Sequence, residues 1–222
     1  MIDFEPKRAL EEITSGLDHL HSLNVVHRDI KPQNILISAQ KTRSRHGKGR
    51  TGHRMLISDF GLCKKLDDDH ASSTSTGGTR GWQAPEILRI RLEERLINLT
   101  ARDGMGDVIP SSSNNTPWSL AQRRLTKSVD IFPLGCLFYY TLTKGRHPYG
   151  DEFEREMNIL KDAKDLFGVE KFGEEAKDLV TKMLNPEPNQ RSVLHLSRIS
   201  TFLSLKLRPD TTMCLEHPYF TE

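Results

Sequence analysis

The sequence predicts a mainly α-helical fold of the α+β class with one short β-hairpin. Apolar residues recur at helical spacing in several segments of the 222-residue chain, whereas one pair of short apolar runs has the character of strands. A chain of this length can bury a substantial core. Its net charge of +2 gives no global argument for binding to nucleic acid or to a membrane surface.

The first predicted helix extends over residues 6–23. Pro6 suits a first helical turn, where a backbone N–H would have no partner within the helix. The apolar residues that follow lie three or four positions apart, as expected on one helix face: Leu10, Ile13, Leu17 and Leu20.

Two strands are predicted at residues 35–37 and 55–57, and we expect them to pair as a hairpin. Such a ladder would hold Asn34 beside Asp59. Residues 39–54, between the strands, are interpreted as a basic insertion. An RNA- or phosphate-binding loop is one interpretation, but a run of charge is more often a solvated surface. Nucleic acid is therefore not an expected partner of this chain.

Three further helices are predicted at residues 88–99, 130–140 and 174–184. The first lies in a second predicted insertion, residues 89–126, which continues into a polar loop. The helix at 130–140 is apolar on all sides and is expected in the core. No apolar stretch is long enough to span a bilayer, and the three scattered cysteines suit a reducing, cytoplasmic compartment.

The most informative segment is residues 27–34, which is followed along the chain by an Asp-Phe-Gly motif at 59–61. Asp29 can receive the proton of a hydroxyl group, and Lys31 can neutralise a phosphate during transfer. Asn34 and Asp59 offer oxygen atoms to a magnesium ion. This set of side chains, in this order, predicts phosphoryl-transfer chemistry.

The segment that opens at Asp59 closes at an Ala-Pro-Glu motif ending in Glu86. Between the two motifs lies a run of hydroxyl side chains: Ser72, Ser73, Thr74, Ser75 and Thr76. A flexible polar loop is one interpretation of this run. Its position between the motifs favours regulatory phosphorylation, with the phosphate meeting Arg28.

Asp130 also has two interpretations. Its carboxylate could be the N-cap of the buried helix. We favour a role in bracing the backbone of the turn from His27 to Asp29, because a site of this kind needs rigid support.

With these residues in view, the chain resembles the serine/threonine protein kinases. It is most similar to the fungal form of the inositol-requiring kinase/endoribonucleases of the unfolded protein response. The resemblance covers residues 10–150 well and the remainder loosely. The segments that carry it are residues 20–27, 56–66, 78–86, 130–132, 138–140 and 147–150.

The resemblance implies the C-terminal lobe of a kinase that uses ATP and Mg²⁺. Asp29 would orient the acceptor hydroxyl and receive its proton, Lys31 would contact ATP, and Thr79 would shape the acceptor site. Asn34 and Asp59 would hold magnesium. The substrate would be serine or threonine on a protein, including a second copy of the chain in a homodimer, at the cytosolic face of the endoplasmic reticulum membrane.

The resemblance also implies structural roles. His27 and Phe60 would pack together as part of a spine. Glu86 would form a buried ion pair with an arginine near the C-terminus. Arg191 and Arg208 are the two candidates, and we favour Arg208 because a proline follows it directly, as in the family.

Two departures from the family pattern stand out. No Gly-rich loop or strand lysine precedes the catalytic segment, so we expect the N-terminal lobe to be missing and the chain by itself to have negligible activity. A C-lobe that acts as a docking or dimerisation module, and a mis-predicted gene fragment, are the alternatives. Residues 192–207 are interpreted as an insertion, either translated non-coding sequence or an extra helix.

Overall fold

The computed structural model describes residues 5–42, 50–66, 77–102 and 125–192, together with Leu196 and Ile199. Its described part is mostly helical with two small antiparallel sheets, which confirms the predicted fold class. The helices are α1 (Pro6–Ser22), α2 (Pro85–Arg102), α3 (Ser128–Leu142), α4 (Arg155–Leu160), α5 (Glu174–Met183) and α6 (Pro188–Ser192).

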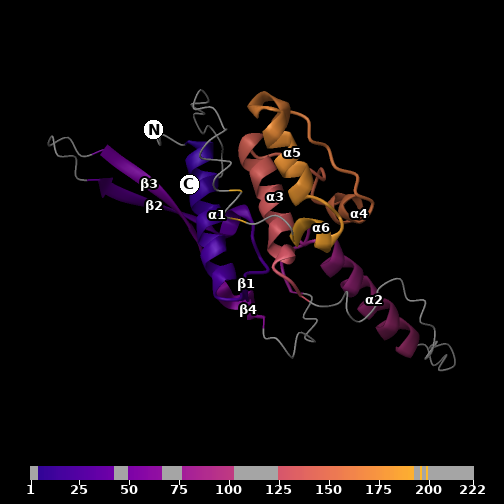
Figure 1. Ribbon diagram of the computed structural model, residues 1–222. Helices are drawn as coiled ribbons and strands as arrows, with labels where there is room; N and C mark the ends of the chain where they lie inside the picture. Colours follow the sequence, from indigo (N-terminus) through magenta and orange to yellow (C-terminus); the bar gives the residue numbers. More distant parts are fainter. Residues whose placement is uncertain are drawn as a thin grey trace.

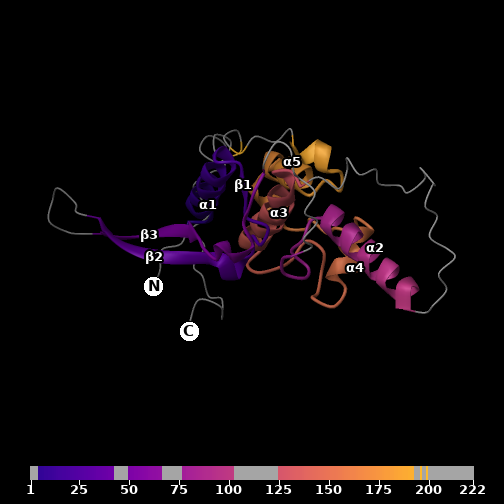
Figure 2. The same ribbon diagram turned by 90° about the horizontal axis from the view of Figure 1, so that it is seen from below.

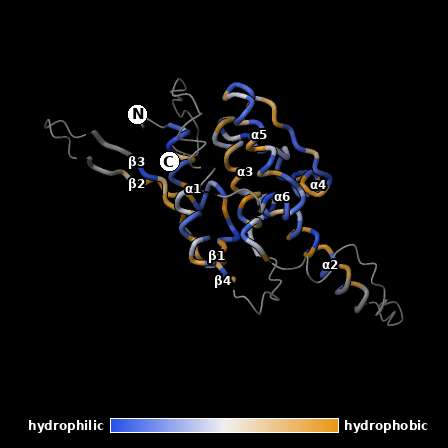
Figure 3. The backbone as a smooth tube through the Cα atoms, viewed as in Figure 1, coloured by the Kyte–Doolittle hydropathy of each residue, from blue (hydrophilic) through white to orange (hydrophobic). Residues whose placement is uncertain are grey.

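Helix α3 forms the centre of the core, between α1 and α5 (Figure 1). Nearly all of its side chains are buried, as expected for a helix that is apolar on all sides. Hydropathy colouring shows the same concentration of apolar residues along α3 (Figure 3). Helix α5 approaches closely at Gly135, where an added Cβ would lie 2.8 Å from the Cβ of Met183. A larger residue would force these two helices apart.

The predicted hairpin is confirmed and is longer than expected. Strand β2 (Ile35–Thr42) pairs with β3 (Arg50–Ile57), with Ile35 opposite Ile57. The strands therefore continue into the predicted basic insertion. The hairpin projects on one side of the helical body, and α2 projects on the other (Figures 1 and 2).

A second, shorter sheet joins β1 (Val25–Val26) to β4 (Lys64–Lys65). Strand β1 follows α1 directly, and β4 follows the Asp-Phe-Gly motif. This pairing places the segment that enters residues 27–34 beside the segment that leaves residues 59–61. Together the two sheets bring the two sequence motifs to one edge of the helical body.

The other predicted helices are also present. The helix predicted at 88–99 begins earlier, at Pro85, and continues to Arg102, so it joins the Ala-Pro-Glu motif without a break. The proposed insertion at 192–207 begins at the last residue of α6, Ser192, and two further residues in it are described. These two, Leu196 and Ile199, are helical and buried. Across the described ranges, no helix combines the length and the apolar character that crossing a membrane would require.

Candidate active site

Asp130 of α3 holds the backbone of the turn that follows β1. One carboxylate oxygen accepts from the backbone N–H of His27 at 2.8 Å, and the other accepts from that of Arg28 at 2.7 Å. The ring Nε2 of His21, on α1, lies 2.9 Å from the same carboxylate. Arg28 has a φ of +71°, a conformation that few non-glycine residues adopt. The expected contact between Asp130 and the turn is present, and it stabilises this strained backbone.

His27 is fully buried and links the two motifs. Its Nδ1 accepts from the backbone N–H of Asp29 at 3.3 Å, so Nε2 carries the proton and donates to the carbonyl of Ser58 at 3.0 Å. The ring also meets Phe60 edge to face, with centroids 5.6 Å apart. His27 therefore acts as a connector in this structure, and both ring nitrogens have partners.

The carboxylate of Asp29 is the focus of a polar cluster. Its Oδ1 accepts from the backbone N–H of Thr79 at 2.8 Å. Its Oδ2 lies 2.8 Å from Nζ of Lys31 and accepts from Nδ2 of Asn34 at 3.0 Å. Lys31 also donates to the hydroxyl of Thr79 at 2.5 Å. The structure thus brings together four of the predicted site residues around one carboxylate.

Asp29 is buried but remains suited to the charged form. Burial by itself raises the pKa of a carboxyl group, since it penalises the charge. Hydrogen bonds from Lys31 and Thr79 outweigh that effect, so the pKa of Asp29 lies below its ordinary value. At neutral pH this side chain is a carboxylate that can accept a hydrogen bond from an incoming hydroxyl group.

Asn34 and Asp59 fit a hard divalent cation such as Mg²⁺. Because the Nδ2 of Asn34 donates to both the carbonyl and the carboxylate of Asp29, its Oδ1 is the amide atom left for a ligand. Asp59 is exposed, and its Oδ1 accepts from the N–H of Gly61 at 3.3 Å. Amide and carboxylate oxygens are the ligands that Mg²⁺ prefers.

The hairpin positions these two residues. The backbone N–H of Ser58, next to Asp59, donates to the carbonyl of Asn34 at 2.9 Å, and the Ser58 hydroxyl donates to the same carbonyl at 3.0 Å. Asp59 itself has a φ of +63°. The ladder therefore continues one step beyond β2 and β3, and it fixes Ser58, the residue before Asp59, beside Asn34.

Glu86 forms a buried ion pair with Arg191, which corrects the choice of Arg208. Arg208 lies outside the described residues. Helix α6 follows α5 after a short turn and directs Arg191 into the core. There its Nε donates to the carbonyl of Ser128 at 3.3 Å, and its guanidinium lies 5.5 Å from the ring of Phe132. The proline that follows Arg208 therefore predicted the partner of Glu86 less well than the short connection between α5 and α6 would have done.

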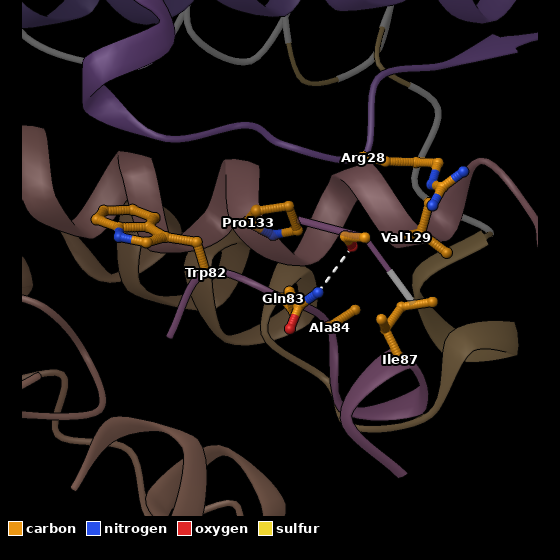
Figure 4. Close-up of a pocket in the computed structure, with 8 residues that line it drawn as sticks. Arg28, Trp82, Gln83, Ala84, Ile87, Val129 and Pro133 are labelled. Atoms are coloured by element: carbon orange, nitrogen blue, oxygen red, sulfur yellow. Dashed lines mark hydrogen bonds between the residues drawn. The ribbon is translucent and has the colours of Figure 1, made fainter. Parts of the chain in front are cut away.

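Arg28 borders a small cavity of about 10 Å³ that is also lined by Gly77, the first described residue after the hydroxyl run (Figure 4). In the same view Gln83 donates to the carbonyl of Gly77 at 2.7 Å. A Cβ on Gly77 would lie 3.1 Å from the guanidinium of Arg28. The hydroxyl run itself, from Ser72 to Thr76, lies outside the described residues, so its pairing with Arg28 stays a prediction.

One charged cluster near the site was not anticipated. Glu156, on α4, forms ion pairs with both Arg80 and Arg91. The two arginines are distant from Glu156 in the sequence, and charged residues at such separations leave no periodic signal. Arg80 follows Thr79 directly, so this cluster adjoins the residue that contacts Asp29.

Comparisons with known proteins agree with this geometry. Residues 3–98 match the family model described as protein kinase domain. The serine/threonine-protein kinase/endoribonuclease ireA of Aspergillus fumigatus is 40% identical over 222 residues, covering 95% of this chain and 18% of that protein.

Two more distant relatives have the same character. The sensor for unfolded proteins in the ER ire1 of Schizosaccharomyces pombe is 38% identical over 84% of this chain and 16% of its own length. The serine/threonine-protein kinase/endoribonuclease IRE1a of Arabidopsis thaliana is 36% identical over 96% of this chain and 18% of its own length. The chain therefore spans less than a fifth of the length of these relatives.

Proposed function

Because the chain belongs to the protein kinase family, we propose that it carries the catalytic apparatus for phosphoryl transfer from ATP to serine or threonine on proteins. In this proposal Asp29 receives the hydroxyl proton as the acceptor attacks. Lys31 neutralises charge on the transferred phosphate, and Thr79 positions the acceptor against Asp29. The single observation that supports it is the carboxylate of Asp29, held by Thr79, Lys31 and Asn34 together.

The geometry supports a base that is oriented before the substrate arrives. Three donors fix the carboxylate of Asp29, two from its own segment (Lys31 and Asn34) and one from Thr79, so it loses little freedom when an acceptor binds. Lys31 contacts Asp29 and Thr79 at the same time. Its ammonium group is therefore held beside the atoms that exchange the proton, where transferred phosphate would carry negative charge.

ATP and Mg²⁺ are the proposed cofactors. Asn34 and Asp59 would hold the cation, which supplies charge neutralisation between the phosphates when bound. The role of these residues is to present oxygen ligands from two segments that the hairpin joins. The amide of Asn34 also donates a hydrogen bond to Asp29, so it connects the proposed cation site to the proposed proton acceptor.

The relatives suggest a setting for this activity. One is named a sensor for unfolded proteins in the endoplasmic reticulum, and others are named kinase/endoribonucleases. We infer a role in unfolded-protein-response signalling at the cytosolic face of the endoplasmic reticulum membrane. The acceptor would include the hydroxyl run at residues 72–76 of a second copy, phosphorylated in trans within a dimer.

The proposal is tested by placing residues 1–222 in the matching segment of Aspergillus fumigatus ireA and measuring transfer of labelled phosphate from ATP to a serine peptide. We expect Asp29→Asn to lower the rate by about 10²–10⁴-fold, since it removes the proton acceptor. Asp178→Asn is the matched control, because Asp178 is an exposed carboxylate paired only with Lys182 in the described structure.

A chimera that melts cooperatively yet transfers no phosphate would contradict the proposed function. So would Asp29→Asn with an unchanged rate. The 222-residue chain alone, incubated with Mg²⁺ and ATP, is expected to show negligible autophosphorylation. Robust incorporation of label by that chain would overturn the expectation, while leaving the role of Asp29 intact.

A further inference from the structure

Two arginines share one carboxylate beside the candidate acceptor site. Arg80 binds Glu156 as a fork, with Nε 3.3 Å from Oε1 and a terminal nitrogen 3.0 Å from Oε2. Arg91, on α2, donates to Oε1 at 3.3 Å. The three side chains come from three separate elements, so the carboxylate of Glu156 lies where these elements meet.

The position of this cluster relates it to the acceptor. Thr79 donates its N–H to Asp29, and Arg80 is the next residue. Neighbouring Cα atoms lie only about 3.8 Å apart. A residue next to the acceptor in a bound peptide would therefore come within reach of the Arg80 side chain.

The cluster has an excess of positive charge and is accessible to solvent. Two guanidinium groups share the carboxylate of Glu156, and the charge of Glu94 also acts on Arg91. The Arg80 side chain is 71% exposed, whereas Arg91 and Glu156 are 19% and 26% exposed, so solvent reaches the cluster from the side of Arg80. A further guanidinium, from Arg155, lies 5.8 Å from the ring of the nearby Trp82. Arginine forks match carboxylate and phosphate groups, and a doubly charged phosphate would satisfy two arginines better than one carboxylate does.

Glu156 is held by two ion pairs of different kinds. The pair with Arg80 lies at the surface, where such ion pairs contribute little to stability. The pair with Arg91 is partly buried, so its guanidinium needs another anion when Glu156 leaves. An anion from a bound peptide can therefore replace Glu156 without disrupting the core. In the absence of a peptide, Glu156 occupies the place of that anion.

We propose that Arg80 and Arg91 form an anion site that selects acceptors with a carboxylate or phosphate on a neighbouring residue, with Glu156 as an internal competitor. This inference deepens the proposed function, on which its use of the word acceptor rests. It also implies that phosphorylation within the hydroxyl run at 72–76 promotes further phosphorylation there. Once one of these consecutive side chains is phosphorylated, its neighbour becomes an acceptor with an adjacent phosphate.

The test measures binding, so it does not depend on catalysis. The 222-residue chain is titrated into three fluorescent peptides that differ only at the residue after the acceptor serine: glutamine, glutamate or phosphoserine. We expect the phosphoserine peptide to bind tightest and the glutamine peptide weakest, with a difference that shrinks as salt is raised.

Substitutions then assign the effect to the cluster. Arg80→Gln should reduce the affinity for the phosphoserine peptide about fivefold and leave the glutamine peptide unchanged. Glu156→Gln, which removes the competitor at constant size, should increase the affinity for the phosphoserine peptide about threefold. Asp178→Asn, which breaks an exposed ion pair on α5, is the control and should change neither affinity.

Equal binding of all three peptides, or weaker phosphoserine binding in Glu156→Gln, would overturn the inference. The melting temperature of each variant shows whether a loss comes from unfolding. The two proposals fail separately. Selective binding by a chain whose ireA chimera transfers no phosphate removes only the proposed function, and a chimera that phosphorylates all three peptides equally removes only the anion site.

Discussion

The turn from His27 to Asp29 is supported on two sides by contacts of different kinds. On the α3 side, the fully buried Asp130 receives hydrogen bonds from backbone N–H groups and from His21. On the side of Thr79, which we call the acceptor side after the proposed function, Thr79 contacts Asp29 and is followed by Arg80, whose largely exposed side chain pairs with Glu156. Buried contacts cannot be exchanged for water without a large loss, whereas exposed ion pairs exchange readily. The first side fixes geometry, and the second is the side that, in our proposal, responds to a substrate.

The largest effect is expected for Asp130→Ala. The change leaves two backbone N–H groups and the ring of His21 without their acceptor. At about 1–3 kcal/mol for each of these three stranded donors, the free energy of unfolding should fall by roughly 3–9 kcal/mol. Urea unfolding of the 222-residue chain measures the loss.

Glu152→Ala serves as the control for Asp130→Ala, because Glu152 is exposed and lies outside the helices. It should leave the unfolding midpoint close to that of the unchanged chain. If Asp130→Ala unfolds at the same urea concentration as this control, the buried contacts of Asp130 do not stabilise the turn. The proposed difference between the α3 side and the acceptor side would then be wrong.

The next largest effect concerns the ion pair of Glu86 and Arg191, which anchors the start of α2. Removing one partner strands a buried charge, so Glu86→Ala should reduce the free energy of unfolding by about 3–5 kcal/mol. Replacing both, as Glu86→Met with Arg191→Leu, should recover much of that loss because no charge is left alone. Urea unfolding again measures the change.

The double replacement decides between two explanations of the ion pair. Recovery means that the single variant fails because of the uncompensated charge. A double variant that is as unstable as Glu86→Ala would instead show that the bonds of Arg191 to Ser128 and to the turn at Asn185 carry the stability.

Local sequence patterns predicted much of the side that faces α3. The spacing of Leu10 and its neighbours indicated α1, and the two apolar runs indicated the hairpin, whose register the structure then set with Ile35 opposite Ile57. These features depend on residues close together in the sequence, where helical or strand periodicity is visible. The contact of Asp130 was expected for a different reason, because a site of this kind needs rigid support for the turn from His27 to Asp29.

Long-range polar contacts were harder to predict. The prediction of Arg208 as the partner of Glu86 was wrong. The choice between Arg191 and Arg208 depends on how α6 turns after α5, and no local pattern encodes that turn. The cluster at Glu156 was missed because its arginines belong to segments distant in the sequence. Exposed charges are common on any surface, so Arg80 and Arg91 carried no distinguishing signal.

The acceptor side also packs on a buried residue, His147. Its ring meets Trp82 edge to face at 4.8 Å, and its Nδ1 accepts from the N–H of Tyr149. Burial, with a smaller contribution from the charge of Arg155, lowers the pKa of His147 to about 2. Below about pH 6.5 the unfolded chain binds a proton at this residue and the folded chain does not.

Stability should therefore fall as the pH is lowered from about 6.5, by at most about 1.4 kcal/mol per pH unit for this single group. In His147→Asn, where the amide oxygen can replace Nδ1 as acceptor, the decline between pH 6.5 and 5 should be shallower by that amount. Replacing the exposed His19 with asparagine should leave the decline unchanged. Parallel curves for the unchanged chain and His147→Asn would show that His147 binds its proton equally in both states. The His147 ring packed against Trp82 would then be open to water, and the acceptor side would lack a rigid, buried support.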